Sequence, residues 1–299
     1  PRTPGLLMLL LLPPPHGFAA AGMGSDVTPG EESRLAVTPD GSHLLFTAPV
    51  RGSYELWRIA LADGAVERLT EDRHYLSGWH AVRTPAGGMR VAAIRSTATA
   101  LSDVHVLDLD TDGRPAGAGA SRPLTSFNEA VLAELDVRAP EERWETVEGR
   151  EIQGWLIRSV AAERGEPAPL ILQIHGGPHT LYGWAPYWEF QVLAGAGISV
   201  FYANPRGSEG YGRDFNEANL GDWGPGPMAD VLAGVDALVA DGLADQERLA
   251  DLLRAAAEHR ARAASFRISS ASDSGKRQRS ASSTRVRLML SCGECASLR

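Results

Sequence analysis

The chain has 299 residues, of which 43% are hydrophobic and 22% charged, as in an ordinary soluble globular protein. Its formal net charge of −8 argues against a general nucleic-acid binder. Its only cysteines, Cys292 and Cys295, cannot supply a disulfide framework, so a reducing compartment and a cytoplasmic location are expected. The apolar run at residues 6–12 is too short to cross a bilayer. We therefore expect neither a nucleic-acid nor a membrane partner.

The N-terminal region reads as a series of short strands. We expect residues 1–32 to be a disordered fragment end, with strands beginning after residue 33. Residues 44–46 follow the pair Asp40-Gly41, which tolerates the backbone angles of a tight turn. Residues 55–59 (ELWRI) alternate polar and apolar side chains, as a strand with one solvated face should.

This order of segments occurs twice. The strand segments 44–46, 55–59 and 67–70 recur about 47 residues later as 91–94, 103–109 and 122–125. A strand-rich repeat of this length is typical of β-propeller blades, which have roughly 40–50 residues each. We therefore expect about two propeller blades within residues 33–138.

The pattern changes after Pro140. Residues 144–157 read as two strands around the turn Glu148-Gly149. Strands then alternate with helices, in the order strand 170–174, helix 184–194, strand 198–202 and helix 228–240. The continuous apolar run at 170–174 is expected of a parallel strand buried on both faces. The alternation predicts an α/β domain with a mostly parallel sheet.

The first of these strands runs directly into His175-Gly176-Gly177-Pro178. Glycines at this position let the backbone approach a ligand, and their N–H groups can stabilise an oxyanion. A plain strand-to-helix turn explains the residues equally well. A metal site at His175 and His179 is disfavoured, because the residues between them oppose a helix and no third ligand stands out. We expect no metal and no cofactor.

A second motif, residues 204–212 (NPRGSEGYG), follows the next buried strand. Its proline and glycines specify a defined, non-helical loop at the same edge of the sheet. Taken alone, this motif is better explained as a structural loop than as a binding loop.

Together the two motifs resemble the prolyl oligopeptidase family of serine peptidases, in particular its acylaminoacyl-peptidase-like and dipeptidyl-peptidase-like branches. That family joins an N-terminal β-propeller to a C-terminal α/β-hydrolase domain and acts on peptides. Its HGGP motif follows the third sheet strand and its NPRGSxGYG motif the fourth. The resemblance implies that His175, Gly176 and Gly177 border an oxyanion hole. It also implies that the loop carrying Arg206 and Tyr211 helps to shape the catalytic pocket.

The sequence departs from the family after Ala250, where a GxSxGG nucleophile elbow is expected. No GxSxG motif occurs anywhere in the chain. Residues 206–210 (RGSEG) come nearest, but Arg206 stands where the first glycine belongs, so we do not assign Ser208 as a nucleophile. His259 has no context that supports it as a base. With no catalytic Ser, Asp or His present, we expect the chain as written to be inactive.

Residues 251–299 differ in character from the rest. They hold ten Arg or Lys against four Asp or Glu, in a chain that is acidic overall. A reading-frame shift or a misassembled gene end explains both the reversed charge and the missing motif, so we expect a non-native or disordered tail. The alternatives are a basic tail that binds RNA or anionic lipid, and a metal site at Cys292 and Cys295. A single CxxC motif is weak support for zinc.

The sequence thus predicts a β-propeller fragment at residues 33–138 and the N-terminal half of an α/β-hydrolase domain at residues 139–250. An unrelated basic tail follows at residues 251–299. The predicted function is that of a serine peptidase which hydrolyses short peptides by acyl transfer. An esterase-type α/β-hydrolase fragment is an alternative, although the propeller repeat disfavours it. A non-catalytic, propeller-containing binding protein is a second alternative.

Overall fold

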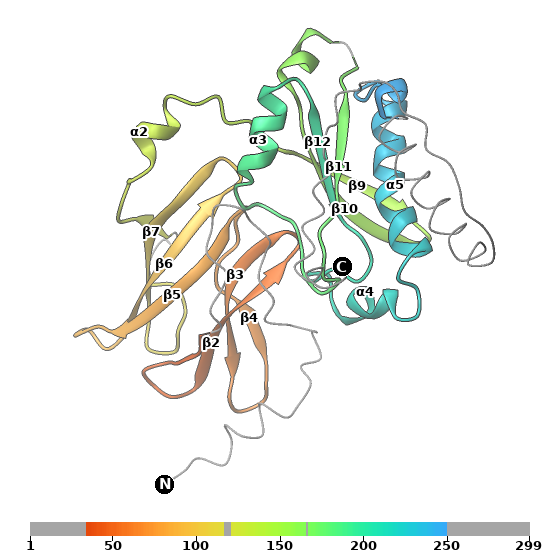
Figure 1. Ribbon diagram of the computed structural model, residues 1–299. Coiled ribbons are helices and arrows are strands. Elements are labelled where there is room, and N and C mark those ends of the chain that lie inside the picture. Colours follow the sequence, from red (N-terminus) through yellow and green to blue (C-terminus); the bar gives the residue numbers. More distant parts are fainter. Residues whose placement is uncertain (1–33, 117–120, 166, 250–299) are drawn as a thin grey trace, which may run out of the picture.

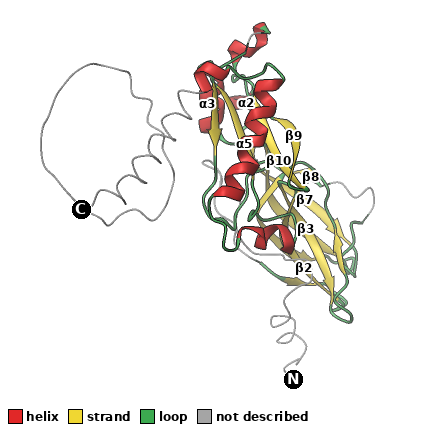
Figure 2. Ribbon diagram, turned by 90° about the vertical axis from the view of Figure 1, so that its right-hand side faces the viewer, coloured by secondary structure: helices red, strands yellow, loops and turns green. Residues whose placement is uncertain are grey.

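The computed structural model describes residues 34–116, 121–165 and 167–249 (Figures 1 and 2). This part of the chain forms one sheet of eight strands and one of four. The expectations for residues 1–32 and 251–299 lie outside the described residues. No helix within the described ranges is long and apolar enough to cross a bilayer.

The first sheet consists of two antiparallel four-strand units. The first unit contains β1 (Ala36–Val37), β2 (His43–Val50), β3 (Ser53–Ala60) and β4 (Val66–Arg68). The second contains β5 (Tyr75–Arg83), β6 (Met89–Thr97), β7 (Ala100–Leu109) and β8 (Arg122–Pro123). The units are joined through one parallel pair, Tyr54 with Tyr75.

Every predicted strand segment of this region overlaps an observed strand. The strands β2, β3 and β4 of the first unit correspond in order to β6, β7 and β8 of the second. Sequence analysis did not identify β1 or β5. The register of β5 shifts at a bulge between Leu76 and Gly78, which breaks the period-two alternation that marks a strand in a sequence.

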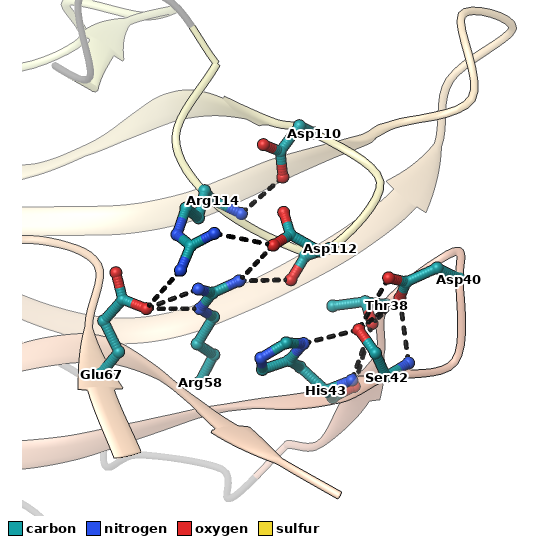
Figure 3. A network of polar contacts seen from close by, with 9 residues as sticks. All are labelled: Thr38, Asp40, Ser42, His43, Arg58, Glu67, Asp110, Asp112 and Arg114. Atoms are coloured by element: carbon teal, nitrogen blue, oxygen red, sulfur yellow. Dashed lines mark hydrogen bonds and ion pairs between the residues drawn. The ribbon is translucent and has the colours of Figure 1, made fainter. Parts of the chain in front are cut away.

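The two units share a hydrophobic core and a polar network. Their common core packs side chains from both units, namely Leu45, Leu56, Leu69, Leu76, Trp79, Met89, Val91, Leu107 and Leu109. At one end of this core Arg58, only 2% exposed, donates to Glu67 and to the Asp112 carbonyl oxygen (Figure 3). Arg114 adds an ion pair to Asp112 at 3.0 Å. A buried guanidinium needs such partners, so this network fixes how the two units meet.

The second sheet has the strand order β11-β12-β10-β9. Its strands are β9 (Glu141–Val147), β10 (Arg150–Ile157), β11 (Leu170–Gln173) and β12 (Ser199–Asn204). As predicted, β9 and β10 flank the turn at Glu148 and Gly149, both of which have positive φ. Strands joined by a turn this short must be antiparallel. The strands β10 and β12 are also antiparallel, which leaves β11–β12 as the one parallel pairing among the described strands of this sheet. The expectation of a mostly parallel sheet is therefore wrong for this part of the chain.

Two helices cover opposite faces of the second sheet, α3 (Trp188–Gly195) and α5 (Pro225–Ala240) (Figure 1). Side chains of β12 alternate between the two sides. Val200 and Tyr202 belong to the cluster that contains α3 residues, and Phe201 and Ala203 to the cluster that contains α5 residues. Burial is complete at Leu170 but decreases along β11, so the expectation of burial on both faces holds only for its first half.

The helix boundaries differ from those predicted. Helix α3 begins at Trp188 rather than Trp184, because Pro186 disfavours helical geometry at the residue before it. Helix α5 begins earlier than predicted, with Pro225 at its first position, where a missing N–H costs nothing. The remaining short elements are α2 (Glu129–Leu132), η1 (Val160–Arg164), α4 (Arg213–Asn216) and η2 (Glu217–Asn219).

The turn between β2 and β3 joins the first sheet to the second. Arg51 N–H donates to the Gly210 carbonyl at 3.1 Å, and Trp184 N–H donates to the Gly52 carbonyl at 2.8 Å. A Cβ on Gly52 would lie 2.5 Å from a ring atom of Trp155, so no larger residue fits without displacing that ring. The turn is therefore inserted tightly against the loops that follow β11 and β12.

Candidate functional site

The two loops predicted from the sequence meet at the carboxyl edge of the second sheet. Because β11 and β12 are parallel, the segments that follow them, residues 175–178 and 204–212, leave the sheet at the same edge. His175 of the first segment lies with Nε2 3.0 Å from Ser208 Oγ of the second. This contact holds the two loops side by side.

His175 and Ser208 have the spacing of a base and a nucleophile, but Ser208 is buried. It is 1% exposed, and its hydroxyl also lies 2.6 Å from the Pro205 carbonyl oxygen. Burial lowers the pKa of His175, so its ring is neutral at pH 7. The one ring proton serves either Ser208 Oγ or the Gly176 carbonyl oxygen, 2.8 Å from Nδ1. Because the described residues bury Ser208, its hydroxyl is not open to a substrate, and the pair acts as a structural link.

Gly176 and Gly177 are exposed at this edge. Neither N–H has a hydrogen-bond acceptor within the described residues. Gly177 has φ 132°, and a Cβ there would lie 2.9 Å from the His179 backbone nitrogen. Glycine is therefore required to hold the backbone in this conformation. The segment thus presents two backbone N–H groups that have no acceptor among the described residues.

Asn204, at the end of β12, is fully buried and clamps the chain after the glycines. Its Oδ1 accepts the Tyr182 N–H at 2.7 Å, and its Nδ2 donates to the Tyr182 carbonyl at 2.8 Å. The Tyr182 ring packs edge-on against His175, with centroids 5.2 Å apart. Burial raises the pKa of Tyr182 to about 12, so the ring stays neutral. This amide clamp sets the position of the first loop relative to the second strand.

Arg206 is buried, and its contacts hold the second loop in place. It is 5% exposed and makes a two-point contact with Asp230 of α5, with Nη2–Oδ1 2.7 Å and Nε–Oδ2 2.9 Å. Its Nη1 donates to Glu148 at 2.8 Å. Asp230 is itself fully buried. Arg206 therefore ties the loop to α5 and to the β9–β10 turn.

Tyr211 links the second loop to the first sheet through a chain of buried polar groups. Its hydroxyl accepts from Asn204 Nδ2 at 2.7 Å and donates to Gln153 Oε1 at 2.5 Å. Gln153 is fully buried, and its Nε2 donates to the Arg51 carbonyl at 3.2 Å and to Glu142 at 2.6 Å. The relay connects the β2–β3 turn with both loops of the site.

Sequence reasoning missed Gln153, Asn204 and Asp230. A weak signal existed for Gln153, which is the one polar residue in the segment Ile152 to Ile157 of β10. No group of three or more potential metal ligands occurs in the part of the chain that is described. The residues His259, Cys292 and Cys295 lie outside it.

The chain is similar to known proteins, and the family model that matches it covers part of the site. The model of the prolyl oligopeptidase family matches residues 184–251. The uncharacterized peptidase YuxL of Bacillus subtilis is 32% identical over 78% of this chain and 34% of its own length. Dipeptidyl-peptidase 5 of Porphyromonas gingivalis is 27% identical over 71% of this chain and 30% of its own length. The chain is related to the prolyl oligopeptidase family.

Solved structures of prolyl oligopeptidase relatives agree with this result. The Pyrococcus horikoshii acylaminoacyl peptidase superposes with a TM-score of 0.58 at 28% identity, covering 72% of this chain and 32% of that one. An acylaminoacyl peptidase in complex with Z-Gly-Gly-Phe-chloromethyl ketone gives a TM-score of 0.59 with the same coverage. The resemblance inferred from the two loop motifs is confirmed. The chain spans about a third of the length of these relatives.

Proposed function

We propose that the chain carries part of a serine peptidase of the prolyl oligopeptidase family. Residues 33–138 would form about two propeller blades, and residues 139–250 the N-terminal part of an α/β-hydrolase domain. Two four-strand units of matching order support the first assignment. The order β11-β12-β10-β9, with helices on both faces, supports the second.

The proposed reaction is hydrolysis of short peptides by acyl transfer. The observation that carries it is a pair of exposed residues, Gly176 and Gly177, whose N–H groups have no acceptor among the described residues and which lie at the carboxyl edge beside the His175–Ser208 link. In acyl-transfer enzymes each such donor contributes about 3–4 kcal/mol to stabilisation of the transition state. Gly176 and Gly177 would supply these donors, and His175 and Tyr211 would hold the two loops in register. Relatives named as peptidases support peptides as the substrate class.

We infer further that this chain does not turn over substrate by itself. It contains no GxSxG motif, and Ser208, the nearest candidate, is 1% exposed. N–H donors without an attacking group cannot start acyl transfer. A fluorophosphonate probe should therefore label no serine of the purified chain. Stoichiometric labelling of a single serine would overturn this inference.

The gene offers an independent test. Reading it past the codon for Ala250 in all three frames should reveal a GGSYGG-like stretch in another frame. If no frame contains a nucleophile elbow, the serine-peptidase proposal loses its source for the attacking group, and a non-catalytic role for this chain becomes the better reading.

A further inference from the structure

A cavity of about 350 Å³ lies where the first sheet meets the second. Three separate segments supply its walls: the β2–β3 turn, the β9–β10 hairpin, and the chain from the second loop into α4. The lining residues are Arg51, Trp144, Arg150, Glu151, Tyr211, Asp214 and Phe215. His175, Gly176 and Gly177 are not among them. A volume near the lower end of the range for small-molecule pockets fits one or two amino acids rather than a long chain.

Aromatic rings form one side of the cavity. Trp144 and Tyr211 meet edge to face, with centroids 6.5 Å apart, and Tyr211 packs against Phe215 at 4.8 Å. The polar tips of two of these rings are already bonded elsewhere. Tyr211 bonds to Gln153, and Trp144 Nε1 donates to Glu142 at 3.2 Å. The rings therefore offer only apolar surface, and Trp144 is 37% exposed. Such a wall favours an aromatic group on the ligand.

Arg51 places a cation at this wall in an unusual backbone conformation. Its φ is 46°, which a residue with a side chain adopts only at a cost of about 1–2 kcal/mol. Its N–H and carbonyl are both held, by Gly210 and Gln153. The guanidinium lies 5.8 Å from the Trp144 ring centroid and forms no ion pair with any described residue. The backbone of Arg51 is therefore fixed at this wall, and its guanidinium, which has no counter-charge among the described residues, can receive an anionic ligand group.

The remaining charges of the cavity are of both signs. Asp214 is exposed and makes no ion pair within the described part of the chain. Among the described residues, Glu151 accepts a side-chain hydrogen bond from Thr146 alone, at 2.7 Å. Arg150 has a long contact of 3.9 Å to Glu148. Two basic and two acidic side chains therefore surround the aromatic wall, which is the complement of a ligand that carries both an ammonium and a carboxylate group.

We propose that this cavity binds a short peptide with free termini and an aromatic side chain. The ring packs among Trp144, Tyr211 and Phe215, the carboxylate pairs with Arg51, and the ammonium group pairs with Asp214. The choice of a peptide over a free aromatic amino acid rests on the proposed function. The assignment of the aromatic ring and the two charged groups to their partners does not depend on the proposed function.

The test uses the full chain and three probes titrated by isothermal calorimetry at low ionic strength. Gly-Phe carries both charges, Gly-Phe-amide lacks the carboxylate, and N-acetyl-Gly-Phe lacks the ammonium group. We expect Gly-Phe to bind most tightly and each capped probe to bind about fivefold more weakly or worse. Equal affinities for the three probes, or no binding of Gly-Phe, would overturn the proposal.

Two variants assign the charges to residues. Arg51→Gly removes the guanidinium and supplies a residue that accepts the positive φ, so the turn keeps its conformation. In this variant Gly-Phe and its amide should bind alike, while the acetylated probe stays weaker. Asp214→Asn should give the opposite pattern. Arg83→Gln, on β5 outside the cavity, should leave all three affinities unchanged.

Persistence of the amide penalty in the Arg51→Gly variant would contradict the assignment of the carboxylate. The calorimetric readout requires no hydrolysis. A failure here is therefore distinct from a failure of the peptidase proposal, which the fluorophosphonate and gene-reading tests decide separately.

Discussion

Substitution of Gly183 by alanine tests whether the two sheets are locked together at the β2–β3 turn. A Cβ on Gly183 would lie 2.5 Å from the Gly52 carbonyl carbon and closer still to its oxygen, whereas real Cβ atoms essentially never approach within 3.0 Å. Both atoms belong to the backbone, so no side chain can rotate away. The turn must retreat, and the hydrogen bond from Trp184 N–H to the Gly52 carbonyl, 2.8 Å long, is then lost.

The magnitude follows from these two effects. Overpacking of a tight site costs about 1–3 kcal/mol, and a buried N–H left without its acceptor costs about 1–3 kcal/mol more. We expect Gly183→Ala to lower the free energy of unfolding by about 2–6 kcal/mol in urea denaturation. Hydrogen exchange at the Trp184 amide should become faster by the factor that corresponds to the same loss of free energy.

The matched control is Gly195→Ala in α3. A Cβ at Gly195 meets nothing within 4 Å, and alanine is the better helix former. This variant should change the free energy of unfolding by less than about 1 kcal/mol, in the stabilising direction. If Gly183→Ala matched wild type within about 0.5 kcal/mol and the Trp184 amide stayed protected, the described junction between the sheets would be refuted.

Three further predictions concern the loops and the sheet edge. Asp230→Asn should lower the free energy of unfolding by about 3 kcal/mol, because it removes the counter-charge of the buried Arg206 guanidinium. In the same denaturation assay Asp236→Asn, on the exposed face of the same helix, should have little effect. Burial holds the pKa of His175 below its unfolded value of 6.5. The contribution of neutral His175 to the free energy of unfolding should therefore be fully present above pH 6.5 and be lost as the pH drops below it. His175→Asn should flatten this part of the stability profile, and an unchanged slope would contradict the burial. Among the described strands, β11 pairs only with β12, so its other edge has unpaired backbone groups that can pair with another chain. Residues 141–299 made alone should therefore aggregate, as detected by light scattering. A monodisperse monomer would show that another segment completes the sheet.

Sequence periodicity was sufficient to predict most of the strands and the position of both loops. The repeat of residues 44–46 at 91–94 reflects a real correspondence between β2 and β6. The two loop motifs could be assigned to one sheet edge because each follows a buried strand directly, and consecutive parallel strands end on the same side. These features are local, or repeat at a fixed spacing, and a single sequence carries them.

The contacts that hold the site together could not be predicted in this way. Gln153 reaches Arg51 across 102 residues, and Arg206 reaches Asp230 across 24. No periodicity links such positions, since the first pairing depends on how the two sheets dock and the second on how α5 packs against the loop that follows β12. Arg206 illustrates the consequence. Its motif implied that the loop helps to shape a pocket, but the sequence did not indicate that the guanidinium itself is buried against Asp230 of α5 and holds that loop in place.

The central proposal is that residues 34–249 supply the oxyanion side of a serine-peptidase site and that the nucleophile is not among the residues of this sequence. In the most direct measurement, residues 34–249 of this chain replace the matched segment of the Bacillus subtilis relative. Fluorophosphonate labelling is then compared among this hybrid, the relative and the unaltered chain. We predict one labelled serine per molecule in the hybrid and in the relative, hydrolysis of short peptides by both, and no labelling of the unaltered chain. A hybrid that melts cooperatively but stays unlabelled while the relative reacts would contradict the claim.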